Sequence, residues 1–150
     1  FFLDSLLAAG FHPLQILTAM ANLFRRMIQL KDFTDSDQGR LWDSGRDYGY
    51  FKREVFPGVE NYDRLFIKAV ETWETGETVK KKTITDLLIA KTPKSPYPVY
   101  MMLQQSENFT KKELIHAIES LREADLRLKS TGQNPKLILE GAVFKILRKL

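Results

Sequence analysis

The chain has 150 residues, of which 43% are apolar and 28% are charged; this composition excludes an intrinsically disordered protein and predicts one folded domain over residues 1–150. Cysteine is absent, which excludes disulfides, thiolate metal ligands and a cysteine nucleophile, and favours an intracellular protein. The balance of 23 Lys and Arg against 19 Asp and Glu permits contact with nucleic acid but is too small to indicate it.

The chain begins inside an apolar helical pattern, FFLDSLLAAG, which Asp4 interrupts. This pattern is too short to span a bilayer, and it lacks the basic flank of a signal peptide. We therefore expect the C-terminal fragment of a longer protein, with no membrane segment and a cytoplasmic location.

The next element is a long helix that begins at Pro13, because the fixed φ of proline suits the first helical residue. Apolar side chains follow at helical spacing on a wide face: Leu14, Ile16, Leu17, Met20, Leu23, Phe24, Met27 and Ile28. Arg25 and Arg26 lie beside this face. We expect both arginines to be solvated, with contact to DNA as the alternative.

The middle of the chain gives a weaker signal. Three glycines and several aspartates between Asp32 and Phe56 predict loops and short helical pieces. A helix is predicted over residues 61–73, where Leu65, Phe66 and Trp73 share a face, and Gly76 is expected to end it.

A basic run and a proline cluster follow. The run of Lys80, Lys81 and Lys82 is expected in a solvated loop or at a helix edge, with contact to phosphate as the alternative. The prolines at 93, 96 and 98 are expected to stop any helix and redirect the chain before a further helix over residues 99–109.

The C-terminal part carries the clearest pattern. Thr110 and Glu113 form a capping box at the start of a helix, and Gly132 is expected to end that helix in a left-handed conformation. Asn134 and Pro135 suit the N-cap and first residue of a last helix. Since no segment shows sustained alternation of period two, the predicted fold class is all-α, an antiparallel helical bundle of about six helices.

Residues that could perform chemistry are few. The two histidines, His12 and His116, stand in no metal-binding motif, and no nucleotide-binding glycine loop occurs. Nominal carboxylate candidates for acid and base catalysis are Glu119, Glu123, Asp125 and Glu140. We expect no catalytic residue, no metal and no cofactor, and we interpret Asp125 and Lys129 as an ion pair one turn apart at a helix end.

The last segment, LREADLRLKSTGQNPKLILEGAVFKIL, resembles the end of the bacterial DNA polymerase III delta subunit, a chain of the clamp loader. The resemblance rests on an Asp-x-x-x-Lys segment, a short turn with glycine, and a Leu-Glu pair in the final helix: Asp125, Lys129, Gly132, Leu139 and Glu140. The segments NFTKKELIHAIESL and GFHPLQILTAMANLFRRMIQLKD are similar to other helices of that family. Residues 33–92 depart from it and are expected to be an insertion.

The resemblance implies a clamp-loader collar domain, which has no catalytic activity and assembles with the collars of the ATPase gamma/tau-type and delta-prime subunits. The parent protein would be a subunit of the DNA polymerase III holoenzyme that helps load the sliding clamp onto DNA. Long helices with wide apolar faces suit such an interface, for which we expect Ile138, Phe144 and Leu147 to face a partner.

The alternative is an autonomous helical domain that binds nucleic acid. It rests on the basic charge balance and would use the cations named above, Arg25, Arg26, Lys80, Lys81 and Lys82. Such binding would weaken steeply with salt, because phosphate contacts release counterions. A collar domain instead predicts partner-dependent assembly and no catalytic turnover.

Overall fold

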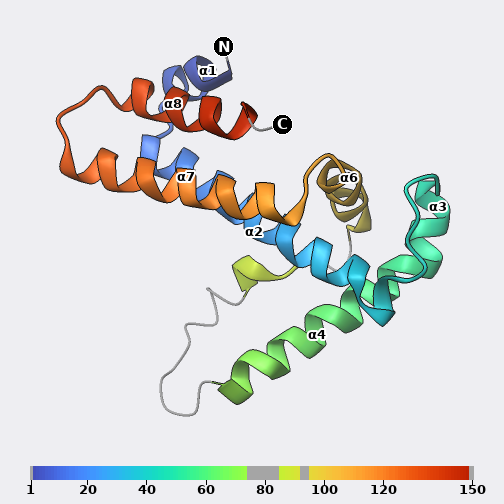
Figure 1. The fold of residues 1–150 in the computed structure, drawn as a ribbon. Helices are drawn as coiled ribbons and strands as arrows, with labels where there is room; N and C mark the ends of the chain where they lie inside the picture. The colour runs from blue at the N-terminus through green and yellow to red at the C-terminus, as the bar shows by residue number, and fades with distance from the viewer. Residues whose placement is uncertain (1, 74–84, 92–94, 149–150) are drawn as a thin grey trace. The chain divides into compact units, whose positions relative to one another are not determined.

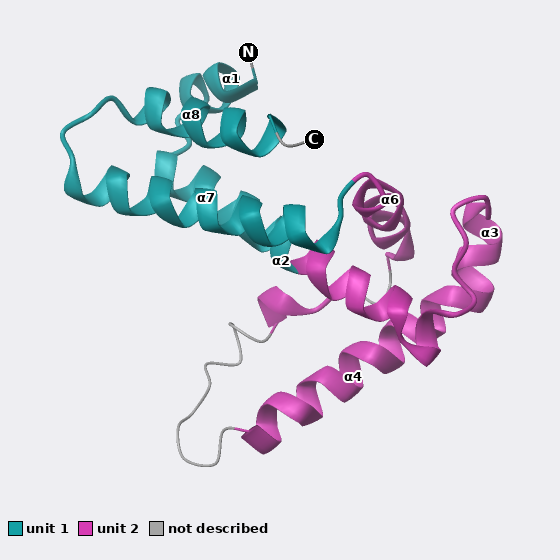
Figure 2. Cartoon of the chain, viewed as in Figure 1, with its two compact units in different colours: residues 1–25, 109–150 teal, residues 26–108 magenta. Residues whose placement is uncertain are grey.

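The computed structural model describes residues 2–73, 85–91 and 95–148, and within these ranges it contains helices and no strand (Figure 1). The predicted all-α class is confirmed. The chain divides into two compact units, unit 1 with residues 1–25 and 109–150 and unit 2 with residues 26–108 (Figure 2). The expected bounds of a single domain with an insertion at 33–92 stay a prediction.

Unit 1 consists of α1 (Phe2–Ala8), the first half of α2 (Pro13–Asp35), α7 (Lys111–Ser130) and α8 (Pro135–Leu147). The helices α7 and α8 run antiparallel and pack against each other, and α1 contacts α8 (Figure 1). Apolar side chains from α2, α7 and α8 form the core: Ile16, Leu17, Ala21, Phe24, Leu114, Ala117, Leu121, Ala124, Ile138, Leu139, Ala142 and Ile146.

The helix starts in unit 1 follow the sequence signals. The hydroxyl of Thr110 accepts from the backbone N–H of Glu113 at 3.2 Å, and the Glu113 carboxylate accepts from the Thr110 N–H at 2.7 Å. The Asn134 side chain accepts from the Lys136 N–H at 2.9 Å, with Pro135 as the first residue of α8. The predicted capping box and N-cap are therefore confirmed, and both satisfy backbone donors that a helix start leaves free.

The end of α7 differs from the prediction. Among the described residues only Gly10 has a positive φ, of 85°, so the left-handed conformation expected at Gly132 is wrong. Two hydroxyl groups instead donate to carbonyls in the last turn and a half of the helix. Ser130 Oγ donates to the Leu126 carbonyl at 2.6 Å, and Thr131 Oγ1 donates to the Arg127 carbonyl at 2.8 Å. Thr131, whose backbone N–H also donates to the Arg127 carbonyl at 3.0 Å, follows the helix in extended conformation.

Unit 2 contains more helix than the sequence predicts. The second half of α2 continues to Asp35, and a short 3-10 turn, η1 (Asp37–Gly39), follows. Short helical pieces were predicted up to Phe56, but α3 (Tyr48–Tyr50), the π turn η2 (Phe51–Val55) and α4 (Phe56–Trp73) form one unbroken helical run, so the helix expected from residue 61 begins earlier. The described residues also include α6 (Pro96–Ser106), with Pro96 and Pro98 inside its first turn, where a missing N–H costs nothing.

The π turn explains why this helical run continues through Pro57 without a break. The backbone N–H of Phe56 donates to the carbonyl of Phe51, five residues earlier, and this wider turn holds one residue more than an α-helical turn. A proline inside a regular helix removes a hydrogen bond and presses its ring against the carbonyl four residues back. The wider turn just before Pro57 relieves that contact.

A short segment of unit 2, residues 85–91, is held by two charged side chains. Arg26 of α2 donates to the carbonyls of Leu88 and Ile89, while Asp63 of α4 accepts from the N–H groups of Ile89 and Ala90 at 2.9 and 2.8 Å. Ile89 is fully buried, and Asp63 is only 7% exposed. These hydrogen bonds satisfy backbone groups that lie outside a regular helix.

None of the helices in the described ranges has the combined length and apolar character that crossing a membrane requires. For the described residues this agrees with the expected lack of a membrane segment; for the other residues the expectation stays a prediction.

Candidate protein-protein interface

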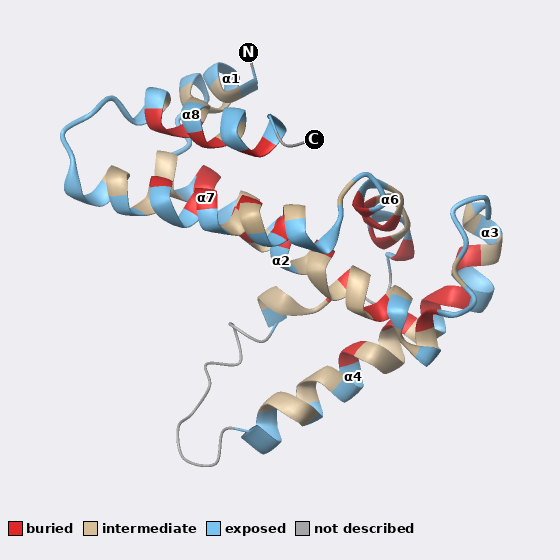
Figure 3. Cartoon of the chain, in the orientation of Figure 1, coloured by how far each residue is buried: buried red, intermediate tan, exposed pale blue. Residues whose placement is uncertain are grey.

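Helix α8 is apolar on almost every side. Its inner face, with Ile138, Leu139, Ala142 and Ile146, is buried. Its outer face nevertheless carries three large apolar residues that solvent reaches: Leu137 at 64%, Phe144 at 74% and Leu147 at 58% exposure (Figure 3). A helix that is apolar on all sides is typical of a protein core, but only one face of α8 is buried in the core of unit 1.

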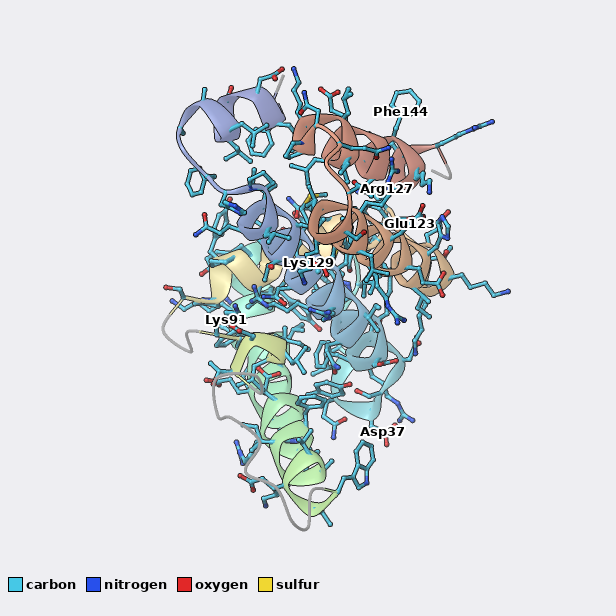
Figure 4. All side chains as sticks on the ribbon, turned by 90° about the vertical axis from the view of Figure 1, so that its left-hand side faces the viewer. Asp37, Lys91, Glu123, Arg127, Lys129 and Phe144 are labelled. Atoms are coloured by element: carbon cyan, nitrogen blue, oxygen red, sulfur yellow. The ribbon has the colours of Figure 1, made fainter. Side chains whose placement is uncertain are left out.

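Helix α8 is fixed to its neighbours in two ways besides its buried face. Lys145 pairs with Glu123 of α7 at 2.6 Å, and the hydrogen bond from Lys145 is the main cause that lowers the pKa of that carboxyl. Lys136 pairs with Asp4 of α1 at 2.6 Å, which lowers the pKa of Asp4 and raises that of Lys136. Phe144 projects outward from the helix (Figure 4). Both ion pairs join α8 to a neighbouring helix of unit 1.

A groove with a volume of about 1060 Å³ lies beside this outer face, between α1, α2 and α8. Its lining is apolar except for Gln15 and Glu140. Two further exposed aromatic residues, Phe2 at 76% and Phe11 at 52%, contribute to the lining together with Phe144. The remaining lining residues are Leu3, Leu6, Ile16, Ala19, Met20, Leu23 and Val143.

Glu140 is the one ionisable side chain that lines the groove. Lys136 forms an ion pair with its carboxylate at 3.7 Å, a longer contact than the 2.6 Å between the same ammonium and Asp4. The ammonium is shared between two carboxylates, and Glu140 has the longer of the two contacts, at the edge of an apolar surface.

A second, polar hollow of about 530 Å³ lies along α7 and the end of α8. His116 Nε2 lies 3.5 Å from Ser120 Oγ, and His116 Nδ1 lies 3.8 Å from a Glu119 oxygen. The order serine, histidine, carboxylate resembles a catalytic triad, but both contacts are at or beyond hydrogen-bond range, and all three residues are on one helix. Within the described part of the chain no three His, Cys, Asp or Glu residues are grouped as metal ligands.

The residues that carried the family resemblance occupy different places in unit 1. Lys129 and Asp125 form the expected ion pair, at 2.7 Å. Leu139 is buried in the core, Gly132 is exposed in the turn, and Glu140 lines the groove. The structure thus brings Glu140 to an apolar surface and gives the other four positions places in the core, at a helix end or in the turn.

Of the three residues expected to face a partner, Phe144 and Leu147 are exposed, but Ile138 is only 2% exposed. Ile138 belongs to the stripe of α8 that packs inward, so it lies in the core of unit 1 and not on its surface. Sequence reasoning missed Leu137, Phe2 and Phe11. The signal for Leu137 was available, since it lies outside the inward stripe of α8.

Of the five cations named as alternative DNA contacts, Arg25 and Arg26 lie in the part of the chain that the structure describes. Arg25 is exposed and donates to the Asn22 side chain at 3.0 Å. Arg26 is half-buried and bound to two backbone carbonyls, so it does not offer a free cation to a phosphate. The run of Lys80, Lys81 and Lys82 lies outside the described residues. Contact of Arg25 and of the lysine run with DNA stays a prediction.

Comparison with protein families gave one informative match, to the family described as DNA polymerase III delta subunit, C-terminal domain. The match covers residues 73–146, which include α6, α7 and almost all of α8, and so the helix that presents the apolar outer face. Neither the curated proteins nor the solved structures gave a match. Over residues 73–146 the chain matches the C-terminal domain of the DNA polymerase III delta subunit, and the resemblance seen in its last helices is confirmed.

Proposed function

We propose that this chain is a non-catalytic assembly domain of a clamp-loader delta subunit and that the outer face of α8 is a surface through which it joins its neighbours. The partners would be the collar domains of the ATPase gamma/tau-type and delta-prime subunits in the bacterial cytoplasm. The sliding clamp and DNA would be reached through the parent complex. The family match gives the clamp-loader setting, and the uncovered apolar face of α8 is the observation that supports assembly.

The size of the apolar surface supports this proposal. The exposed fractions of Phe2, Phe11 and Phe144 together amount to about two fully exposed phenylalanine side chains, or roughly 300–500 Å². Leu137 and Leu147 add to this on the same helix as Phe144. The largest apolar patch on a typical monomer is about 300–600 Å², and a stable interface takes about 800 Å² from each partner. The three phenylalanines alone therefore reach the size of the largest apolar patch on a typical monomer, and the two leucines enlarge the surface further.

A second candidate function, direct binding of nucleic acid, is supported by the distribution of charge. The sequence of unit 1 contains ten Lys and Arg against six Asp and Glu, whereas that of unit 2 contains thirteen of each, so the whole basic excess lies in unit 1. Lys129, Lys136 and Lys145 are held in ion pairs, which reduces the charge they offer to phosphate. Assembly is therefore the better supported function.

The deciding experiment compares two leucines of equal exposure in unit 1. Leu147 on α8 is 58% exposed, and Leu126 on α7 is 57% exposed. The chain, its Leu147→Asp variant and its Leu126→Asp variant are each mixed with the collar domains of the ATPase-type and delta-prime subunits, and the complexes are sized by chromatography with light scattering. We expect Leu147→Asp to abolish the mixed complex and Leu126→Asp to leave it intact.

Two other outcomes would contradict the proposal. If neither substitution affects a complex that does form, the outer face of α8 is not the interface. If the chain ignores every loader subunit but binds duplex DNA with an affinity that falls steeply with salt, the nucleic-acid function takes its place. Circular dichroism of each variant separates lost association from lost folding.

A further inference from the structure

We propose that the groove between α1, α2 and α8 takes an amphipathic helix of a partner protein, with an apolar stripe toward α2 and a Lys or Arg that pairs with Glu140. This inference rests on the proposed assembly function and names the chemistry of the partner. Helices that bind in grooves do so through apolar anchors at positions i, i+3 or i+4, and i+7.

The dimensions of the groove fit such a helix. Its floor is one face of α2 from Gln15 to Leu23, a rise of roughly 12 Å along the helix axis. Anchors at i and i+7 of a bound helix span roughly 10.5 Å. The volume of about 1060 Å³ is at the upper end for small-molecule sites, which measure about 300–1,000 Å³. Several large side chains would therefore be accommodated along the floor.

The lining chemistry favours side chains over a polar ligand. Ala19 leaves room at the middle of the floor, and Met20 beside it has a flexible side chain that adapts to the shape of a partner. Phe2 and Phe144 stand on α1 and α8, which form the two walls, and both are about three-quarters exposed. Exposed aromatic side chains of this kind are the groups that dominate binding energy when a partner buries them.

Glu140 sets the charge of the occupant. A partner that covers the groove would remove water from a carboxylate whose ion-pair partner, Lys136, lies 3.7 Å away and is shared with Asp4. Burial of a poorly paired charge is costly, and a cation on the partner removes that cost. A neutral or acidic helix of the same shape would leave the carboxylate unpaired.

The same residue argues against a second copy of this chain as the occupant. The apolar face that a second copy would offer is the outer face of α8, on which Glu140 lies between Leu137 and Phe144 in the helical repeat. Such a copy would bring a like charge against Glu140. A different chain with a basic residue in that place fits better.

The test uses two synthetic helical peptides that share an apolar stripe and differ only at the position flanking it, Lys in one and Glu in the other. Their binding to the 150-residue chain is measured by fluorescence anisotropy at about 0.15 M salt, where exposed charges more than about 8 Å apart are screened. We expect the Lys peptide to bind at least tenfold more tightly than the Glu peptide. The preference should reverse in Glu140→Lys and disappear in Glu140→Gln.

Glu119→Lys is the matched control, because it makes the same charge change at an exposed position on α7 outside the groove. It should leave the preference for the Lys peptide intact. Equal binding of the two peptides, or equal loss of preference in Glu119→Lys and Glu140→Lys, would overturn the proposal. So would a dimer of the chain alone that excludes both peptides. Far-ultraviolet circular dichroism verifies that each variant is folded.

The two proposals can fail separately. If a mixed complex with loader subunits forms, is lost in Leu147→Asp, and is unaffected by Glu140→Lys, the assembly function stands and the groove inference is wrong. If no loader subunit binds but the peptide preference follows Glu140, the groove is a helix-binding site and the loader assignment is wrong.

Discussion

Substitution of Asp63 tests how unit 2 is held together. Its carboxylate is 7% exposed and accepts two backbone hydrogen bonds, from Ile89 and Ala90. Asp63→Ala leaves both buried N–H groups without an acceptor, at about 1–3 kcal/mol for each, and it removes the negative charge beside Arg26. We expect the free energy of unfolding to fall by about 2–6 kcal/mol, which is large against the total stability of a small domain.

Tryptophan fluorescence is a suitable probe, because both tryptophans, Trp42 and Trp73, belong to unit 2. With a urea dependence of about 1–3 kcal/mol per molar, a loss of about 3 kcal/mol lowers the unfolding midpoint by about 1–3 M. The control is Asp86→Ala in the same segment, which breaks only a half-exposed pair with Lys91 at 3.2 Å and should cost less than about 1 kcal/mol. Equal effects of Asp63→Ala and Asp86→Ala would refute this account of the segment.

The pH dependence provides an independent check. Burial raises the pKa of Asp63 and outweighs the hydrogen bonds from Ala90 and Ile89 and the charge of Arg26, which lower it. The folded protein therefore holds the proton at pH values where the unfolded chain, with a pKa near 3.8, has lost it. The contribution of Asp63 to the free energy of unfolding falls as pH rises from about 3.8 through the folded pKa, and it is constant above. Unfolding of the neutral variant Asp63→Asn, measured across that range, should lack this slope, and a slope equal to that of the wild type would contradict the reasoning.

Two further substitutions test local features of unit 1. Gly10→Ala should cost about 1–2 kcal/mol, because position 10 has φ of 85°, whereas Gly132→Ala should be neutral or slightly stabilising, and thermal unfolding of the pair compares them directly. An equal loss at both glycines would mean that the turn after α7 needs a left-handed residue after all. Thr110→Ala should lower stability by about 0.5–2 kcal/mol through loss of the α7 cap, whereas Thr110→Ser should retain most of it; urea unfolding followed by circular dichroism would show whether the two differ.

The features that the sequence predicted correctly are contacts between residues that lie close together in the sequence. The capping box joins residues three apart, and the Asp125–Lys129 pair joins residues four apart, so one helical turn defines each contact. The position of Pro135 at the start of α8 follows from its own fixed φ. Such signals need no knowledge of the tertiary fold.

The errors arose where distant residues decide the outcome. Arg26 was expected to be a solvated flank, but its acceptors, Leu88 and Ile89, lie 62 and 63 residues further along the chain. The groove likewise depends on α1 and α8, which come from opposite ends of the sequence and meet only in the folded unit. The inward position of Ile138 depends in the same way on how α8 is rotated against α7, which a helix that is apolar on every side does not specify.

The π turn before Pro57 has a consequence for which sequence changes this region tolerates. Lys52 and Arg53 within it are exposed, so deletion of either one removes no buried side chain, yet it would return the turn to regular α-helical spacing. The ring of Pro57 would then meet the backbone of the preceding turn. The extra residue and the proline are thus epistatic: a one-residue deletion should be harmful while proline occupies position 57 and mild once Pro57→Ala has been made.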